Sequence, residues 1–310
     1  MRKHAFQQLT WNALDAQALL HLIELARAED LEGAGLLESF PYAMDVTCAA
    51  MLDAGVTGRA RLVARQPMVL CGTRLVPLVL AAYGGDCDYM PRCDDGQVLD
   101  AGAVIGELSG DVVQMLQAER VLLNFVQKLS GIATLTSTYV KALDGTATRV
   151  LDTRKTTPGY RVLEKYATAC GGGWNHRRGL YEWILVKDNH LSGSGAEEGA
   201  RLAERVRRAK RRFPDLIVEV EVDRMDQIEP VMEAGADIIM LDNFETPSLR
   251  EAVAQVGGRA ITEASGGITL NRLPEIGRTG VDFVSCGATV HQSQWVDIGL
   301  DWGESPGQST

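Results

Sequence analysis

The second half of the chain alternates between short apolar runs and helical segments, and this alternation restricts the possible folds more than any other feature. The runs are rich in Val, Ile and Leu, and a segment with helical apolar spacing separates each run from the next. Six such units in series predict parallel strands joined by right-handed crossovers, because parallel neighbours need a long return connection. The runs cover residues 149–152, 183–186, 216–222, 236–241, 260–263 and 281–285.

A closed barrel and an open doubly wound sheet both fit this alternation. Polar residues suited to a binding site follow nearly every run, for example Thr153 after the first, Lys187 after the second and Asp242 after the fourth. A barrel builds its site from the loops after all of its strands, whereas an open sheet concentrates the site at one switch point. The sequence therefore favours a TIM-like α/β barrel.

The first half has a different organisation. A helical pattern covers residues 14–28, and short strand-like runs follow at 60–64, at 68–71 and within a glycine-punctuated stretch over 98–108. These features predict a small domain with helices against an open sheet. The pattern over 112–143 is helical again, with an expected break near Gly131.

Composition excludes several classes of protein. The 310 residues carry a formal net charge of -10, with 31 Lys and Arg against 41 Asp and Glu, which makes nucleic acid a poor partner. No apolar run approaches the roughly 20 residues that a membrane helix needs. The six cysteines lack metal-site spacing, and we interpret them as reduced thiols of a cytoplasmic protein.

A cluster of cations stands out against this acidic background. Within about forty positions the chain places Arg154, Lys155, His176, Arg177 and Lys187 with few acids among them. Arg grips a carboxylate with a planar fork, whereas Lys supplies a mobile charge suited to phosphate. An isolated pair such as Arg154 and Lys155 would be ordinary surface charge, but the full cluster predicts a compact anionic ligand.

Acidic residues follow the third and fourth runs. Strand alternation sends Glu219 and Glu221 to one face and the neighbouring valines to the other, and Asp242 ends the next run. A buried carboxylate needs a partner. One possible partner is Lys187, in a purely structural ion pair or in a binding site. The other is Mg²⁺ that bridges to substrate oxygens.

Glycines mark the last two loops and one earlier loop. Ser265, Gly266 and Gly267 precede a helical segment and Gly287 opens another, and free N–H groups at helix starts bind phosphate. Residues 171–173, just before Asn175 and His176, are three glycines. These glycines either form a flexible helix end or allow the backbone to approach a ligand closely.

A polar stripe runs along the helix expected over 112–143. Arg120, Asn124 and Gln127 recur at helical spacing among apolar residues. The stripe is either a solvated face or a route by which Arg120 reaches an active site, its own or that of a partner chain.

Taken together, these motifs resemble the quinolinate phosphoribosyltransferase family, the decarboxylating nicotinate-nucleotide pyrophosphorylases of NAD biosynthesis. The resemblance runs from about Asp45 to Leu300. The segments that carry it are Asp-Thr-Arg-Lys-Thr-Thr-Pro-Gly at 152–159, Gly-Gly-Gly-Trp-Asn-His-Arg at 171–177, Lys-Asp-Asn-His at 187–190, Glu-Val-Glu-Val-Asp at 219–223, Leu-Asp-Asn-Phe at 241–244 and Glu-Ala-Ser-Gly-Gly at 263–267.

The resemblance implies a domain organisation. Residues 1–130 would form an N-terminal α/β open-faced sandwich, residues 131–290 a catalytic TIM-like barrel with fewer than eight strands, and residues 291–310 a segment returning to the first domain. The family works as a homodimer or a larger homo-oligomer, in which Arg120 would enter the neighbour's site.

The resemblance also implies roles for individual residues. Quinolinate would be held by Arg120, Thr153, Arg154, Lys155, His176 and Arg177. Phosphoribosyl pyrophosphate would be held by Lys187, Glu221, Asp242, Ser265, Gly266, Gly267, Gly287 and His291. Lys155, Lys187, Glu221 and Asp242 would carry the catalysis, and Glu221 and Asp242 would bind Mg²⁺ with substrate oxygens. No nucleic acid or membrane partner is implied.

The chain departs from the family pattern at a few positions. Trp174 stands where a small residue or Lys is usual and would narrow the pocket or stack on the substrate ring, and Val290 and Gln292 flank His291 where Thr and Ser are usual.

Two other functions remain open. One is that of a same-fold relative with another acid substrate or no transferase activity, such as a molybdenum-locus protein, which typically lacks the motifs at 175–177 and 187–190. The other is that of an aldolase-type barrel with Lys187 as a Schiff-base nucleophile.

Overall fold

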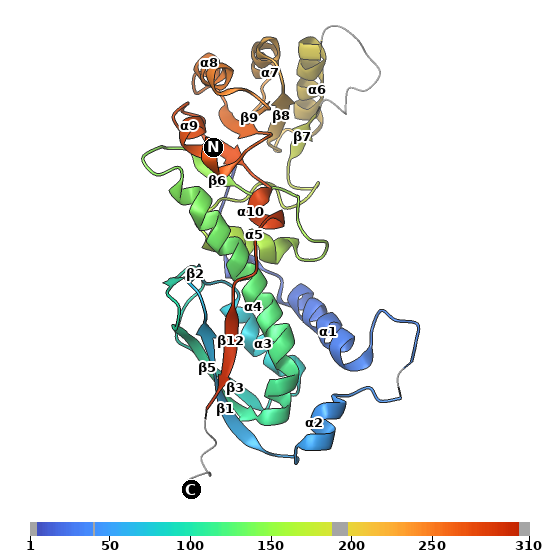
Figure 1. Ribbon diagram of the computed structural model, residues 1–310. Coiled ribbons are helices and arrows are strands. Elements are labelled where there is room, and N and C mark those ends of the chain that lie inside the picture. The colour runs from blue at the N-terminus through green and yellow to red at the C-terminus, as the bar shows by residue number, and fades with distance from the viewer. Residues whose placement is uncertain (1–4, 40, 188–197, 304–310) are drawn as a thin grey trace. The chain divides into compact units, whose positions relative to one another are not determined.

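The computed structural model describes residues 5–39, 41–187 and 198–303, and these divide into two compact units (Figure 1). The N-terminal unit holds residues 10–135 and 293–303, and the barrel unit holds residues 5–9 and 136–292. The sequence predicted boundaries after residues 130 and 290. Contacts within each unit place them after Leu135 and Gln292, and they assign residues 5–9 to the barrel unit.

An antiparallel four-stranded sheet forms the centre of the N-terminal unit. Its order is β12 (Ile298–Trp302), β1 (Thr57–Ala64), β5 (Val104–Asp111) and β3 (Cys87–Pro91). Leu62 and Leu108 lie on the face that is buried, whereas Arg61 and its cross-strand partner Glu107 lie on the opposite face. This is the predicted open-faced arrangement, and the mixed α/β class is confirmed.

The unit contains further strands and helices. They are the strand pair β2 (Met68–Val69) and β4 (Val98–Leu99), and the helices α1 (Ala16–Glu32), α2 (Val46–Met51) and α3 (Val76–Ala82). Neither α3 nor β3 was predicted from the sequence pattern. The stretch over 98–108, expected to be strand-like throughout, divides into β4 and β5 around a turn in which Ala103 N–H donates to Asp100 O at 3.2 Å.

Helix α4 (Val112–Lys141) is continuous, so the expected break near Gly131 was wrong. Its buried residues, including Met115, Leu122 and Leu129, recur at helical spacing and form one apolar face. A Cβ at Gly131 would collide with the carbonyl oxygen of Gln294, so the glycine permits close backbone approach and does not end the helix.

The barrel unit contains a parallel six-stranded sheet in the order β6-β11-β10-β9-β8-β7. The first strand of the series pairs with the last, since Val150 of β6 lies opposite Val284 of β11, and this pairing curves the sheet into a barrel. Among the described residues one seam, between β6 and β7, lacks strand pairing. The predicted barrel with fewer than eight strands is confirmed. The strands are β6 (Arg149–Leu151), β7 (Ile184–Val186), β8 (Val218–Val222), β9 (Ile238–Asp242), β10 (Ile261–Ser265) and β11 (Phe283–Ser285).

Helices alternate with these strands, as the crossover rule requires (Figure 1). They are α5 (Arg161–Cys170), α6 (Glu198–Arg212), α7 (Ile228–Glu233), α8 (Thr246–Val256), α9 (Leu273–Gly277) and α10 (Ala288–His291). The barrel interior holds an aromatic and aliphatic cluster that includes Phe6, Leu151, Trp183 and Ile238.

The sequence predicted no membrane-spanning helix and reduced cysteines. None of the described helices is long and apolar enough to cross a membrane. All six cysteines are free thiols, and Cys48, Cys71 and Cys286 are buried.

Candidate active site

A cavity of about 690 Å³ opens at the carboxyl ends of the barrel strands. Each of the strands β7 to β11 contributes lining side chains. The other lining residues come from α10 and from the loops that follow β6, α5, β7, β9, β10, β11 and α10. All predicted site residues except Arg120 line it: Thr153, Arg154, Lys155, His176, Arg177, Lys187, Glu221, Asp242, Ser265, Gly266, Gly267, Gly287 and His291. Arg120 lies exposed on the part of α4 that belongs to the N-terminal unit. Asp188, Asn189 and His190 fall outside the described residues.

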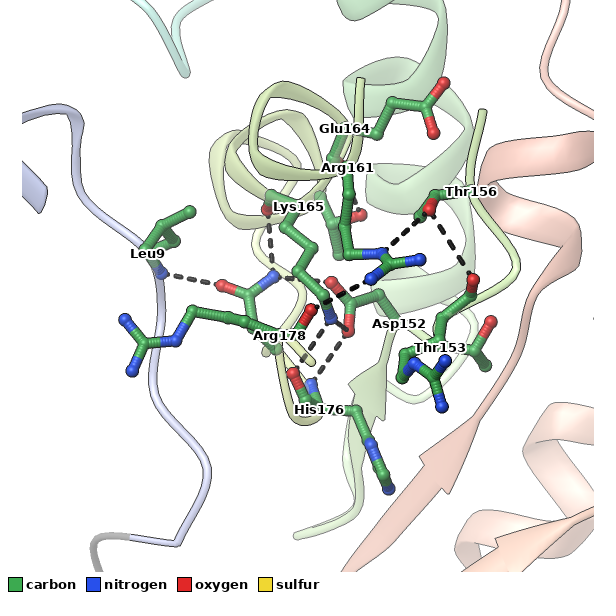
Figure 2. Close-up of polar contacts among 12 residues, drawn as sticks. Leu9, Asp152, Thr153, Thr156, Arg161, Glu164, Lys165, His176 and Arg178 are labelled. Atoms are coloured by element: carbon green, nitrogen blue, oxygen red, sulfur yellow. Dashed lines mark hydrogen bonds and ion pairs between the residues drawn. The ribbon is translucent and has the colours of Figure 1, made fainter. Parts of the chain in front are cut away.

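A fully buried ion pair holds the loop that carries His176 and Arg177 (Figure 2). Lys165 Nζ lies 2.6 Å from Asp152 Oδ1 and donates to His176 O at 2.8 Å. Asp152 also accepts hydrogen bonds from Asn175 Nδ2 at 2.7 Å and from His176 N at 2.8 Å. Burial raises the pKa of Asp152 and lowers that of Lys165, and the pair and its hydrogen bonds offset this cost.

The loop after β6 is fixed by its own polar contacts, several of which Figure 2 shows. Lys155 N donates to Thr153 Oγ1 at 3.0 Å, and Arg161 Nε donates to Thr156 Oγ1 at 3.1 Å. Thr157 N donates to Glu164 Oε2 at 2.8 Å. These bonds tie the loop to α5 and orient the neighbouring Arg154 at the cavity.

His176 lies in a buried pocket beside two acids, Glu219 of β8 and Glu263 of β10, whose strands flank β9. Its Nε2 lies 3.0 Å from Glu219 Oε2 and 3.7 Å from Glu263 Oε2, and Trp183 Nε1 donates to Glu219 Oε2 at 2.8 Å. Burial opposes the imidazolium, but Glu219 and then Glu263 outweigh it and raise the pKa of His176. The site therefore favours a cationic His176.

Glu263 is the acid of this pair whose pKa is raised. It is fully buried, and among the described residues neither of its oxygens has a hydrogen-bond partner. Burial and the neighbouring Glu219 raise the pKa of Glu263 to about 8. His176 lowers the pKa of Glu219 against the effect of burial, so the two carboxyls share one negative charge beside the imidazole.

Arg154 and Arg177 bring two guanidinium groups to the same cavity. Arg177 is buried and donates through Nη1 to Trp183 O at 3.0 Å. The buried Nε of each arginine has no hydrogen-bond partner in the described part of the chain. Burial and then the charge of Arg154 lower the pKa of Arg177, so an anion bound here would relieve a repulsion already present.

The predicted acids and Lys187 line the cavity at the ends of β7, β8 and β9. Lys187 Nζ forms an ion pair with Glu221, and Asp242 accepts a hydrogen bond from its neighbour Asn243 Nδ2 at 2.8 Å. Asn243 adopts a left-handed backbone with φ of 57°, which is rare outside glycine and common at functional turns. Both acids line the cavity, so the face predicted for Glu221 from strand alternation is correct.

The glycine loops form the remaining wall. Gly266 has φ of +82°, and a Cβ there would collide with Asn243, so a side chain is excluded. At Gly287 a Cβ would meet Lys155 Cδ at 2.9 Å and the His291 ring at 3.2 Å. Lys155 and His291 therefore both lie close to Gly287, at the part of the cavity that the glycine loops form.

Sequence reasoning missed some lining residues and misplaced one. Glu263, Asn243, Ser285 and Cys286 line the cavity without having been assigned a role. Period-2 alternation from Ser265 would have found Glu263, because residues two apart in a strand share a face. Trp174 was expected to narrow the pocket or to stack on the substrate ring, but it is not among the lining residues, and its ring centroid lies 4.4 Å from the Arg149 guanidinium.

Comparisons with known proteins agree with this geometry. Residues 45–130 match the family model of the quinolinate phosphoribosyl transferase N-terminal domain, and residues 132–301 match that of the C-terminal domain. The carboxylating nicotinate-nucleotide pyrophosphorylase of Mycobacterium leprae is 37% identical over 283 residues, which cover 90% of this chain and 98% of the relative.

Solved structures give the same result. The nicotinate-nucleotide pyrophosphorylase of Francisella tularensis is similar with a TM-score of 0.85 and 36% identity, covering 94% of this chain and 98% of that one. The enzyme of the same name from Ehrlichia chaffeensis gives a TM-score of 0.83 at 28% identity, covering 94% of this chain and 100% of that one.

Proposed function

The chain belongs to the quinolinate phosphoribosyltransferase family, and we propose that the cavity of its barrel holds the two substrates against two different groups of lining side chains. The reaction is phosphoribosyl transfer from phosphoribosyl pyrophosphate to quinolinate, with decarboxylation, and it gives nicotinate mononucleotide for NAD biosynthesis. Both substrates are small anions, which suits a cationic cavity in a protein of net charge -10.

One observation carries the assignment of the acid side. Arg154 and Arg177 line the cavity, their buried Nε groups have no hydrogen-bond partner among the described residues, and His176 beside them has a raised pKa. Arg binds carboxylates through paired N–H groups. Two guanidiniums and an imidazolium therefore suit the two adjacent carboxylates of quinolinate, with Thr153 in the same group.

The other group of lining side chains suits phosphoribosyl pyrophosphate. Glu221 and Asp242 would accept hydrogen bonds from ribose hydroxyls, and Lys155 and Lys187 would face its phosphates. Ser265 and the glycines at 266, 267 and 287 leave backbone N–H groups accessible to a phosphate, near His291.

Glu221 and Asp242 also fit Mg²⁺, which proteins commonly bind through one or two carboxylates together with substrate phosphates. When bound there, Mg²⁺ neutralises charge that develops on the departing pyrophosphate. Glu221 forms an ion pair with Lys187 in the absence of substrate. When substrate binds, we expect this pair to separate, so that Glu221 contacts the ribose and Lys187 contacts the phosphates.

The chemistry then rests on positioning and electrostatics. Pyrophosphate leaves C1 of the ribose through an oxocarbenium-like state, and Lys155 and Lys187 stabilise the departing charge. The pyridine nitrogen attacks C1 while Arg154 and Arg177 hold the ring in line. The resulting pyridinium favours loss of the adjacent carboxylate as CO₂, since the electron pair left on carbon neighbours a positive nitrogen, and a proton then replaces the carboxylate. No nucleophilic side chain is required.

We further propose that the enzyme is a homodimer or larger homo-oligomer in which Arg120 serves a neighbour's site. Arg120 is exposed and belongs to the N-terminal unit, whereas the cavity belongs to the barrel unit. Mixing the variants Arg120→Ala and Arg154→Ala at a quinolinate concentration well below the raised KM, where each variant alone has little activity, tests this. A mixed oligomer can combine an intact Arg120 with an intact Arg154. Recovery of activity is expected, and no recovery after subunit exchange would argue against a shared site.

The acid-binding group is tested by substitution. Arg154→Ala and Arg177→Ala should each raise the KM for quinolinate by about tenfold or more, because hydrogen bonds to charged groups are worth about 1.5–3 kcal/mol. Arg250→Ala, which removes an exposed cation on α8 away from the cavity, is the matched control and should leave the KM unchanged. Equal effects of all three substitutions would refute the assignment.

A further inference from the structure

Residues 5–9, the N-terminal strap, contact the loop that carries the acid-binding residues. Asn175 N donates to Gln7 O at 2.9 Å, in an antiparallel bridge, and Leu9 N donates to Asn175 Oδ1 at 2.7 Å. Gln8 Nε2 donates to Gly173 O at 3.1 Å. The strap thus runs beside the 173–175 segment and is joined to it by one isolated β-bridge and two side-chain hydrogen bonds, and Figure 2 shows Leu9 next to the buried network of Asp152.

The strap also places an aromatic side chain inside the barrel. Phe6 is 2% exposed, and its ring centroid lies 5.8 Å from that of His176, 5.6 Å from Trp183 and 4.5 Å from Phe283. Phe6 does not line the cavity, so it contacts His176 from the core side.

The surroundings of His176 show what Phe6 contributes. The backbone of His176 is hydrogen-bonded on both sides, through N to Asp152 and through O to Lys165, and the His176 Nε2 is paired with Glu219. Rotation of the ring about its own axis is restricted by side-chain packing, which Phe6 and Trp183 supply, with the Trp183 centroid at 5.1 Å. With Nε2 turned to Glu219, Nδ1 is the ring nitrogen for which the described residues provide no hydrogen-bond partner.

We propose that Phe6 is a positioning residue for the acid substrate. By filling the space behind the imidazole, Phe6 holds His176 with Nε2 at Glu219 and Nδ1 toward the cavity, where a carboxylate of quinolinate binds. The family models match residues 45–130 and 132–301, so the strap lies outside both matched regions. The inference rests on the proposed function in taking quinolinate as the ligand of His176.

Two variants of Phe6 and one control test the proposal in the full chain. Phe6→Leu keeps most of the apolar volume, and Phe6→Tyr keeps the ring. Val256→Ala removes a comparable core contact from α8, which is buried in the same unit but away from the cavity. The measurements are the KM for each substrate and the imidazole signals in long-range proton–nitrogen spectra, which resolve the five histidines of the chain.

Phe6→Leu should raise the KM for quinolinate by about tenfold, the equivalent of one weakened contact, and leave the KM for phosphoribosyl pyrophosphate within about twofold. The His176 Nε2–H signal should broaden in Phe6→Leu and be retained in Phe6→Tyr and Val256→Ala. An unchanged KM for quinolinate, or equal changes in both KM values, would overturn the proposal while leaving the family activity intact. A wild-type chain that failed to use quinolinate would refute the proposed function instead, and the imidazole signal would still decide whether Phe6 holds the ring.

Discussion

Replacement of Lys165 by Met removes one half of the buried ion pair beneath the acid-binding loop. Both side chains of the pair are fully buried, and the Nζ–Oδ1 distance is 2.6 Å. Met keeps the length and the apolar stem of the lysine, so the change isolates the charge. Asp152 would retain two neutral donors, Asn175 Nδ2 and His176 N, and His176 O would lose its donor.

The expected cost is large. Breaking a buried pair by removing one partner destabilises a protein by about 3–5 kcal/mol, because an uncompensated charge remains. The two hydrogen bonds left on Asp152 place the estimate near the lower end, at about 3 kcal/mol. For a unit of this size each kcal/mol lowers the Tm by about 2–4 °C, so the Tm of the barrel unit should fall by roughly 6–12 °C.

A double-mutant cycle provides the assay. Urea unfolding, monitored by tryptophan fluorescence, would give the free energy of unfolding for wild type, Lys165→Met, Asp152→Asn and the double variant. The double variant removes the uncompensated charge, so it should be more stable than the sum of the two single losses by about 2 kcal/mol or more. Strict additivity, or a loss below about 1 kcal/mol in Lys165→Met, would refute the reasoning.

Three further predictions concern the cavity. Gly266→Ala should raise the KM for phosphoribosyl pyrophosphate and lower the free energy of unfolding by about 1–3 kcal/mol, because a Cβ at φ of +82° collides with Asn243. A loss of stability with an unchanged KM would contradict a role for this glycine in substrate binding. The Glu263 carboxyl has a pKa raised by burial and by Glu219 from 4.5 to about 8, so its contribution to stability is full below pH 4.5 and is lost as the pH rises through 8. Melting curves of Glu263→Gln should lack that decline, and an unchanged pH dependence would count against the raised pKa. Glu221→Gln should weaken the Mg²⁺ dependence of the rate, measured by metal titration, and an unaltered half-saturating concentration would contradict the assignment.

The sequence predicted the architecture of the barrel because hydrophobic period and loop chemistry are local properties. Alternation in β8 was sufficient to place Glu219 and Glu221 on the interior face, and glycines at 266 and 287 were recognisable from their position after strands. Gly131 was misread because the same residue serves to end a helix or to admit a neighbouring backbone. Only the contact with Gln294 distinguishes these two uses.

The supports of the site could not be predicted from local pattern. Lys165 lies on a helix whose sequence resembles an ordinary amphipathic segment, and its burial depends on Asp152 in another element. Phe6 contacts His176 from 170 positions away in the chain, and nothing in the sequence around it marks this contact. Positive φ at Asn243 likewise follows from the packing of two neighbouring loops.

The ratio of CO₂ to pyrophosphate released by the wild-type protein tests the central claim most directly. The purified chain would be supplied with Mg²⁺, phosphoribosyl pyrophosphate and either quinolinate or nicotinate, and both products would be counted in the same reaction. The account predicts equal amounts of the two products with quinolinate and neither with nicotinate. Pyrophosphate without CO₂, or no release of either product from quinolinate, would contradict it.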